Sequence, residues 1–152
     1  MPDNRETGDG TDPSEILHAS CVACQGRAVL IVGRSGQGKS GLALQLMAYG
    51  ADLVADDRTQ VTVQDERLWA TAAPELVGLI EARGVGLLRA SITDTAEVVL
   101  VVDLDTDETD RLPLAHTVSV SGITLPKLHK VDSPYFPAAV LQYLKAGRKE
   151  PS

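Results

Sequence analysis

Hydrophobic positions along the chain fall into short runs whose spacing predicts strands more often than helices. Five such runs lie at residues 16–25, 28–32, 59–64, 67–71 and 97–104. The second and fifth are nearly continuous apolar stretches, which is typical of strands buried on both faces. The third and fourth are separated only by Asp65 and Glu66, so we expect them to form a hairpin.

Two segments have helical propensity instead. The first is 42–49, which Gly50 ends, and the second is 133–147, with Pro137 in its first turn and Gly147 near its end. These elements predict one α/β domain, more specifically a strand-rich α+β domain, with no internal repeat and no second domain.

Three further stretches complete the list of predicted elements. Residues 116–130 alternate well enough for two strands broken at Gly122, and residues 105–113 (DTDETDRLP) are predicted to form a charged loop. Gly84 and Gly86 interrupt the apolar run 79–90, and one interpretation of them, apart from the motif described below, is a bulge.

Length and charge limit the classes of protein. The 152 residues suit one globular domain, and a net charge of −7 argues against nucleic acid as a partner. Residues 1–14 are acidic without apolar periodicity, so we expect a disordered tail before a domain at 15–148. We find no membrane-spanning run and no signal peptide, and we expect a cytoplasmic protein.

The two cysteines, Cys21 and Cys24, form a lone C-x-x-C inside a predicted strand. Positions three apart on a strand face opposite sides, so we interpret them as two structural thiols. His116, His129 and Trp69 are also interpreted as structural.

A phosphate-binding loop is the strongest motif. It fits G-x-x-x-x-G-K-[ST] and consists of Gly33, Arg34, Ser35, Gly36, Gln37, Gly38, Lys39 and Ser40. A buried strand precedes it and a helix follows, which is the context in which backbone N–H groups cradle phosphates. We expect Lys39 to reach the β- and γ-phosphates and Ser40 to bind Mg²⁺.

Two adjacent carboxylates, Asp56 and Asp57, follow the short apolar run Leu53 to Ala55. Neighbouring like charges are unfavourable unless a cation or a proton-transfer role requires them. The alternative is a simple turn after a strand.

Residues 33–61 resemble the catalytic domain of HPr kinase/phosphorylase, a family that phosphorylates a serine of the phosphocarrier protein HPr. Three other motifs share the resemblance. They are His18, fifteen residues before Gly33, then Glu81-Ala82-Arg83-Gly84-Val85-Gly86, and then Asp110-Arg111-Leu112. The resemblance runs from about residue 15 to 130.

The resemblance implies a fold related to phosphoenolpyruvate carboxykinase and an ATP- and Mg²⁺-dependent serine kinase that regulates the phosphotransferase system. It also implies a homo-oligomer, a hexamer, and a short form that consists of the catalytic domain only. The expected partner is HPr or an HPr-like carrier. Phosphorylase activity is less supported, because the segment 128–136 lacks a Gly-Arg pair that long members carry.

The resemblance also implies roles for individual residues. Asp57 would be the general base, and Lys39 and Arg111 would offset charge on the transferred phosphoryl group. His18 would be a polar or proton-sharing partner beside the phosphates. Ser40, Glu81 and Asp56 would hold the metal.

Two other functions stay open. One is a P-loop kinase for a small metabolite, with Asp103 at the end of its metal-binding strand. The other is a non-catalytic nucleotide sensor. Gly41 is compatible with it, because this position is commonly polar in the family.

Overall fold

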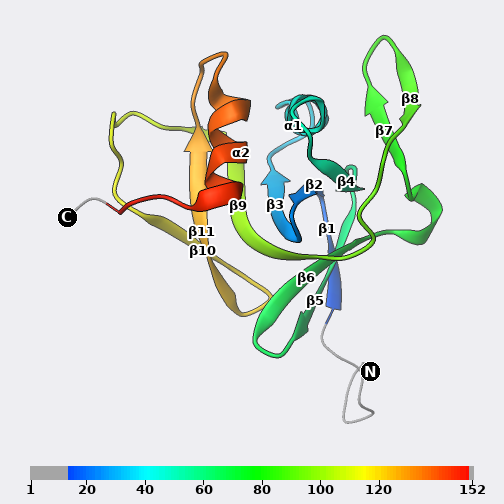
Figure 1. Cartoon of the computed structure of the whole chain (residues 1–152), viewed down its shortest axis with the longest axis horizontal. Coiled ribbons are helices and arrows are strands. Elements are labelled where there is room, and N and C mark those ends of the chain that lie inside the picture. Colours follow the sequence, from blue (N-terminus) through cyan, green and yellow to red (C-terminus); the bar gives the residue numbers. More distant parts are fainter. Residues whose placement is uncertain (1–13, 151–152) are drawn as a thin grey trace.

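In the part of the chain that the structure describes, nine strands pair into one mixed sheet, two others, at residues 79–82 and 86–89, form a separate two-stranded sheet, and the two predicted helices pack on one face of the large sheet (Figure 1). The computed structural model describes residues 14–150. Its strands are β1 (Ser14–Leu17), β2 (Ala19–Cys24), β3 (Arg27–Val32), β4 (Asp52–Ala55), β5 (Thr59–Gln64), β6 (Arg67–Ala72), β7 (Leu79–Ala82), β8 (Gly86–Arg89), β9 (Ala96–Asp107), β10 (His116–Val120) and β11 (Ile123–Lys130). The helices are α1 (Lys39–Ala48), α2 (Phe136–Ala146) and a 3-10 turn, η1 (Pro74–Leu76).

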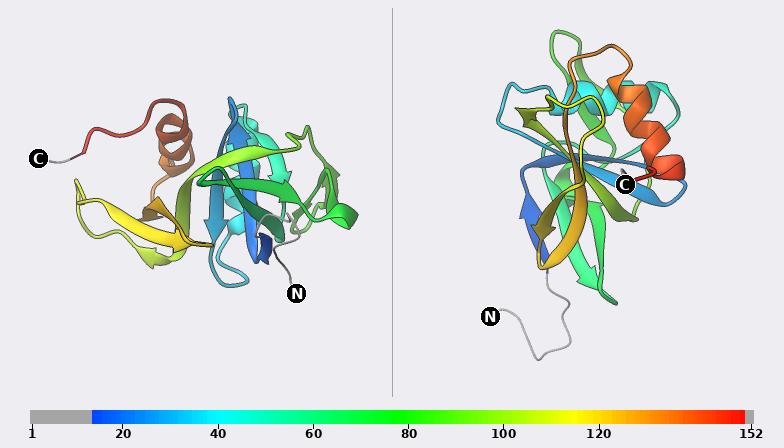
Figure 2. Two further views of the ribbon diagram at one scale, coloured as in Figure 1. Left: turned by 90° about the horizontal axis from the view of Figure 1, so that it is seen from below. Right: turned by 90° about the vertical axis from the view of Figure 1, so that its left-hand side faces the viewer.

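The long strand β9 organises the sheet. The strand order is β1-β5-β6-β9-β3-β2-β4, and β11 also pairs with β9 and carries β10 at its outer edge. β9 runs parallel to β3 and β11 and antiparallel to β6. The hairpins β7–β8 and β10–β11 therefore lie at opposite sides of the molecule, as Figures 1 and 2 show.

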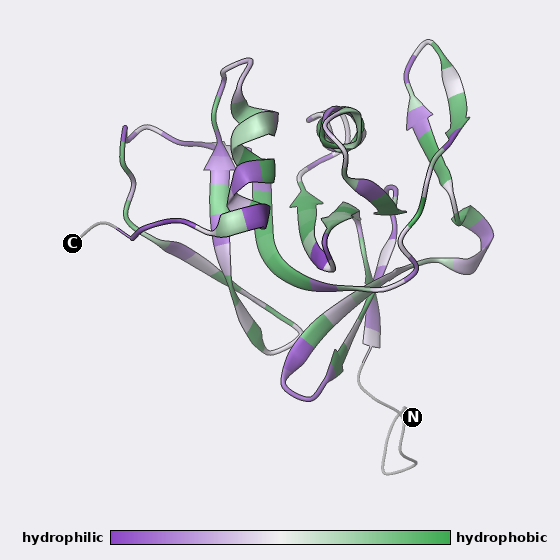
Figure 3. Cartoon of the chain, viewed as in Figure 1, coloured by the Kyte–Doolittle hydropathy of each residue, from purple (hydrophilic) through white to green (hydrophobic). Residues whose placement is uncertain are grey.

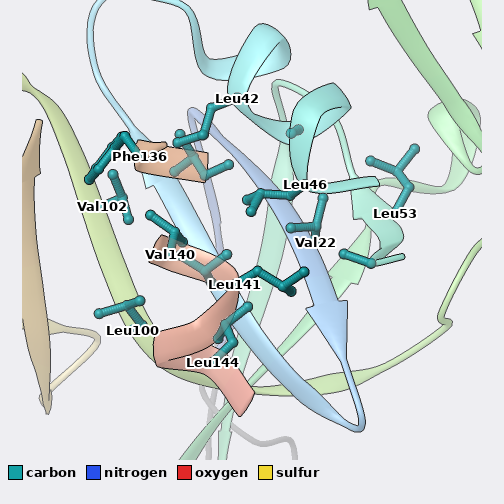
Figure 4. Packing of buried hydrophobic residues seen from close by; sticks show 14 of the residues in the cluster. Val22, Leu42, Leu46, Leu53, Leu100, Val102, Phe136, Val140, Leu141 and Leu144 are labelled. Atoms are coloured by element: carbon teal, nitrogen blue, oxygen red, sulfur yellow. The ribbon is translucent and has the colours of Figure 1, made fainter. Parts of the chain in front are cut away.

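Two hydrophobic clusters cover the two faces of the central strands. Alternate residues of β2 and β3 contribute to each, as expected for strands buried on both sides. One cluster lies under both helices, and Figure 4 shows Leu46 of α1 and Val140 of α2 converging on Val22 and Leu100. The colouring in Figure 3 follows this arrangement, with β3 and β9 mainly hydrophobic and the β5–β6 turn hydrophilic.

The cysteines separate between these clusters. Cys21 is fully buried in the cluster away from the helices, whereas Cys24 packs against the helix-covered cluster. Both are free thiols, and burial raises the pKa of Cys21. The prediction that the two thiols face opposite sides of the sheet is confirmed, and their structural role stays a prediction.

Two expectations about local structure are wrong. Residues 79–90 do not contain a bulge in one strand, because β7 and β8 form an antiparallel hairpin whose turn contains Gly84 at φ 83°. The stretch 105–113 is not all loop either, since β9 continues to Asp107, where it still pairs with β11. Backbone pairing with β11 extends the strand into these exposed residues, and hydropathy alone does not indicate such pairing.

The limits of the domain agree with the sequence only in part. Residues 1–13 of the predicted tail lie outside the described residues, and Ser14, which we also assigned to the tail, begins β1. Within residues 14–150, neither helix is long and apolar enough to cross a membrane.

Candidate active site

The phosphate-binding loop connects the buried strand β3 to the first turn of α1. Gly38 caps the helix in a left-handed conformation, φ 99°, and its carbonyl accepts the amide N–H of Leu42 at 2.9 Å. A Cβ on Gly33 would lie 3.2 Å from the Cβ of Leu104, so glycine allows the loop to pass close to β9. The helix N-terminus is thereby directed at the space in front of the loop.

Lys39 is folded back over this loop. Its side chain is largely buried, and Nζ donates to the carbonyl oxygens of Gly33 at 2.8 Å and Arg34 at 3.4 Å. These carbonyls hold the ammonium group at the loop, where it is available to phosphate oxygens.

The carboxylate of Asp105, near the end of β9, stabilises the loop. The sequence motifs did not identify this residue. Its oxygens accept the backbone N–H of Arg34 at 3.0 and 3.2 Å, and Oδ1 also accepts Nε of Arg34 at 3.3 Å. These bonds, with the Arg34 backbone N–H first, hold the pKa of Asp105 below its ordinary value. The only signal in the sequence was its place at the start of the charged stretch 105–113.

Asp56 is the centre of a buried hydrogen-bond network. Its Oδ1 accepts the hydroxyls of Ser40 at 2.6 Å and Ser20 at 2.9 Å, and its Oδ2 accepts the backbone N–H of Glu81 at 3.0 Å. The carboxylate therefore links β2, α1 and β7. Ser20 had no recognisable signal in the sequence, because a serine in a predicted strand is ordinary.

The side chain of Asp57, unlike that of Asp56, is exposed. Its backbone is in the left-handed region, φ 66°, and the N–H of Arg58 donates to the carbonyl of Asp56 at 2.7 Å. This tight turn leaves Asp57 exposed, with Oδ1 2.7 Å from Nε2 of His18. The two adjacent carboxylates thus belong to different environments.

These groups surround one pocket of about 580 Å³. It is lined by His18, Ser35, Gly36, Gly38, Lys39, Ser40, Gly41, Leu44, Asp57, Glu81, Ala82 and Arg83. The structure therefore brings His18, the phosphate loop, Asp57 and the Glu81 motif together, although they are separated in sequence. Asp56 lies directly behind Ser40.

Arg111 and Asp103 are placed differently. Arg111 is exposed in the segment between β9 and β10, on the side of the molecule away from β7–β8 (Figure 1), and is not among the pocket-lining residues within 14–150. Asp103 accepts the N–H of Asp105 at 2.8 Å and the hydroxyl of Thr106 at 3.0 Å, so it stabilises the end of β9. The structure does not bring either residue to the pocket.

Comparison with known proteins identifies the family of the chain. Residues 11–130 match the family model described as the HPr serine kinase C-terminal domain. The chain belongs to this family. The matched range contains the phosphate loop, the Asp56–Asp57 pair and the Glu81 motif.

Relatives of this HPr serine kinase domain are longer proteins. HPr kinase/phosphorylase of Limosilactobacillus reuteri is 36% identical over 129 residues, covering 76% of this chain and 40% of the relative. HPr kinase/phosphorylase of Streptococcus pneumoniae is 38% identical over 125 residues, covering 74% of this chain and 40% of the relative. The chain thus spans about 40% of the length of these curated relatives.

The fold has a solved counterpart. The Hpr(Ser) kinase/phosphatase from Coxiella burnetii matches with a TM-score of 0.74 and 24% identity, covering 86% of this chain and 88% of that one. The predicted fold, a strand-rich kinase domain of the HPr kinase type, is confirmed.

Proposed function

We propose that the protein is an ATP- and Mg²⁺-dependent serine kinase that phosphorylates HPr or an HPr-like carrier and so regulates the phosphotransferase system. The observation that carries this proposal is the exposed carboxylate of Asp57, held 2.7 Å from His18 at the pocket that the phosphate loop lines. The curated relatives named HPr kinase/phosphorylase support the choice of substrate.

The pocket residues fit a nucleotide with a magnesium ion. Backbone N–H groups of residues 33–40 and the ammonium of Lys39 would bind the phosphates. The hydroxyl of Ser40 and the carboxylate of Asp56 are hard oxygen ligands in contact, which suits Mg²⁺, and the Glu81 side chain lines the same pocket. When bound, Mg²⁺ would neutralise charge on the phosphate oxygens.

Asp57 would act on the protein substrate. Its carboxylate would accept the proton of the serine hydroxyl as the oxygen attacks the γ-phosphorus, while the bond from the γ-phosphorus to the β–γ bridging oxygen breaks and ADP leaves; in the reverse direction it would return a proton to the serine oxygen. His18 would orient Asp57 through the bond between Nε2 and Oδ1. Ser20 supports the geometry from behind, because its hydroxyl accepts the backbone N–H of Asp57 at 3.2 Å.

The accessibility of this pair favours a macromolecular acceptor. The side chains of His18 and Asp57 are 51% and 56% exposed, so a serine on the surface of another protein can approach them. A small metabolite would more commonly be enclosed. In the small-metabolite alternative Asp103 would hold the metal, but its carboxylate is hydrogen-bonded to Asp105 and Thr106.

The test is incubation of the purified chain with HPr, ATP and Mg²⁺, scored by intact-protein mass spectrometry. We expect HPr to gain one phosphoryl group, and the Lys39→Ala variant to give none. No mass increase with the unaltered chain, despite nucleotide binding, would contradict the kinase proposal and favour the nucleotide sensor.

Phosphorolysis is a second activity of the same site. It is favoured by the His18–Asp57 pair, which can supply a proton to the serine oxygen in reverse, and by the names of the relatives. Loss of phosphate from phosphoserine-HPr on addition of inorganic phosphate would detect it. The role of Arg111 and the assembly into hexamers stay predictions.

A further inference from the structure

Two histidines that do not line the nucleotide pocket lie side by side at the β10–β11 edge of the sheet. His116 pairs with Lys127 across the antiparallel ladder, and His129 follows two residues later on the same face of β11. Their imidazole rings stack with centroids 4.1 Å apart and planes 20° from parallel.

An irregularity in the neighbouring pair of strands adds a carboxylate. The register of β11 against β9 moves from His129 opposite Asp103 to Lys130 opposite Asp107, so β9 gains three residues at this point. The N–H of Glu108 then donates to the carbonyl of Lys130 at 2.8 Å. Such irregularities redirect side chains, and here Glu108 meets both histidines.

The distances between the three side chains match a metal coordination shell. Oε1 of Glu108 lies 3.2 Å from Nε2 of His116 and 3.7 Å from Nδ1 of His129. One ligand atom from each residue falls within a set whose members all lie within 4.8 Å of one another. Ligands about 2.1 Å from a tetrahedral zinc ion would be roughly 3.4 Å apart. The two distances from Oε1 of Glu108 lie on either side of that value, and the stacked imidazole rings would turn toward the ion when it binds.

Glu108 is prepared for this role by its surroundings. Its side chain is 10% exposed, and its other oxygen, Oε2, accepts the backbone N–H groups of Thr109 and Asp110, each at 3.1 Å. These bonds, with the Asp110 N–H first, lower the pKa of Glu108 and leave Oε1 directed at the imidazoles. Ligating carboxylates are commonly oriented by such outer hydrogen bonds.

We propose that Glu108, His116 and His129 form a binding site for a divalent transition-metal ion of the zinc class, with water in the fourth position. Two imidazole nitrogens and one carboxylate oxygen favour Zn²⁺ over Mg²⁺, which prefers oxygen ligands. The site is separate from the nucleotide pocket.

The position of the site suggests what the ion does. Glu108 is the first residue of the segment 108–115 that links β9 to β10, His116 directly follows this segment as the first residue of β10, and Arg111 lies within it. A bound ion would tie both ends of this segment to β11 and restrict its motion. Hydrogen exchange of residues 109–115 should therefore slow when zinc binds.

The test titrates the chelator-treated full chain with Zn²⁺ against a chromogenic chelator, in the presence of excess Mg²⁺. We expect one zinc ion per chain, and at least tenfold weaker binding for His116→Gln and for His129→Gln. His18→Gln is the matched control, because it makes the same change at the nucleotide pocket and should leave zinc affinity unaltered. Bound Co²⁺ should show the visible absorption of a site with nitrogen ligands.

Three results would overturn the proposal. They are no zinc binding by the unaltered chain, equal binding by the unaltered chain and both variants, and loss of binding in His18→Gln alone. The partly exposed His116 makes His116→Gln informative even if His129→Gln fails to fold, and circular dichroism of the metal-free variants checks this. Kinase activity is not the readout, so this test is independent of the proposed function.

Discussion

Nε2 of His18 lies 2.7 Å from Oδ1 of Asp57, and a backbone hydrogen bond lies beside this contact, because the N–H of the next residue, Ala19, donates to the carbonyl of Asp57 at 3.1 Å. The side-chain contact is therefore held by the pairing of the chain beside it. Both side chains stay about half exposed at the pocket. The neighbouring residue in the sequence, Asp56, has a buried carboxylate that holds a hydrogen-bond network together. The roles of the two aspartates can therefore be separated by mutation.

We expect Asp57→Asn to lower the rate of phosphoryl transfer to HPr by about 10²- to 10⁴-fold, the usual contribution of a general base. Nucleotide affinity should change little, because in the proposed function the phosphates would contact residues 33–40. Transfer is measured by mass spectrometry and affinity by titration with a fluorescent ATP analogue.

Asp103→Asn is the matched control for that change. It also converts an aspartate near the end of a strand into the amide, but Asp103 bonds to Asp105 and Thr106. It should retain most activity. If Asp103→Asn abolishes transfer and Asp57→Asn does not, the assignment of Asp57 as the base is wrong and a P-loop arrangement with Asp103 at the metal becomes the better one.

His18→Gln should reduce kcat for transfer by about 10- to 100-fold, because a hydrogen bond to a charged group contributes about 1.5–3 kcal/mol. The expected split is a lower kcat with a similar KM for ATP, since His18 orients the base and the loop binds the nucleotide. Steady-state kinetics with varied ATP measures both. His18→Asn places an amide nearer the backbone and should retain less activity than His18→Gln. If both variants are as active as the unaltered chain, His18 has no positioning role.

Asp56→Ala should destabilise the fold by about 2–4 kcal/mol, because two hydroxyls and one N–H group lose their buried acceptor. The free energy of unfolding in urea measures this. Asp57→Ala is the control at the neighbouring residue. It removes a half-exposed side chain and should cost less than about 1 kcal/mol. Equal losses in the two variants would show that Asp56 is not the centre of the network.

The strands and the phosphate loop could be predicted because their signals are local. Continuous apolar runs identify β3 and β9 whatever their partners, and the spacing of glycines, Lys39 and Ser40 specifies the loop. The β7–β8 hairpin could not be predicted in the same way. Its strands have four residues each and are mostly exposed, so they lack a clear hydrophobic period.

The different roles of the two aspartates depend on geometry that hydropathy does not contain. The positive φ at Asp57 places its carboxylate in the exposed pocket, whereas the carboxylate of Asp56 is buried. Nothing in the neighbouring sequence indicates this positive φ. The meeting of Glu108, His116 and His129 likewise depends on strand register. We interpreted both histidines as structural because their sequence spacing has no metal-site period.

Asp105 makes the stability of the phosphate loop depend on pH. Its pKa in the folded protein lies below the ordinary value of about 4, because its carboxylate accepts the N–H of Arg34. The charged form is thus favoured by folding, so its contribution is complete above pH 4 and is lost as the pH falls through the folded pKa. The free energy of unfolding of the unaltered chain should exceed that of Asp105→Asn at pH 7, and the gap should close toward pH 3.

Urea denaturation from pH 7 to pH 3 measures that gap. Asp65→Asn, in the exposed β5–β6 turn, is the matched control, and Glu108 is unchanged in all three proteins, so its own titration cancels in the comparison. Weaker nucleotide binding by Asp105→Asn at pH 7 should accompany the loss of stability, since the N–H of Arg34 belongs to the loop that faces the phosphates. A gap that stays constant with pH would show that the Arg34–Asp105 bond does not stabilise the loop through its charge.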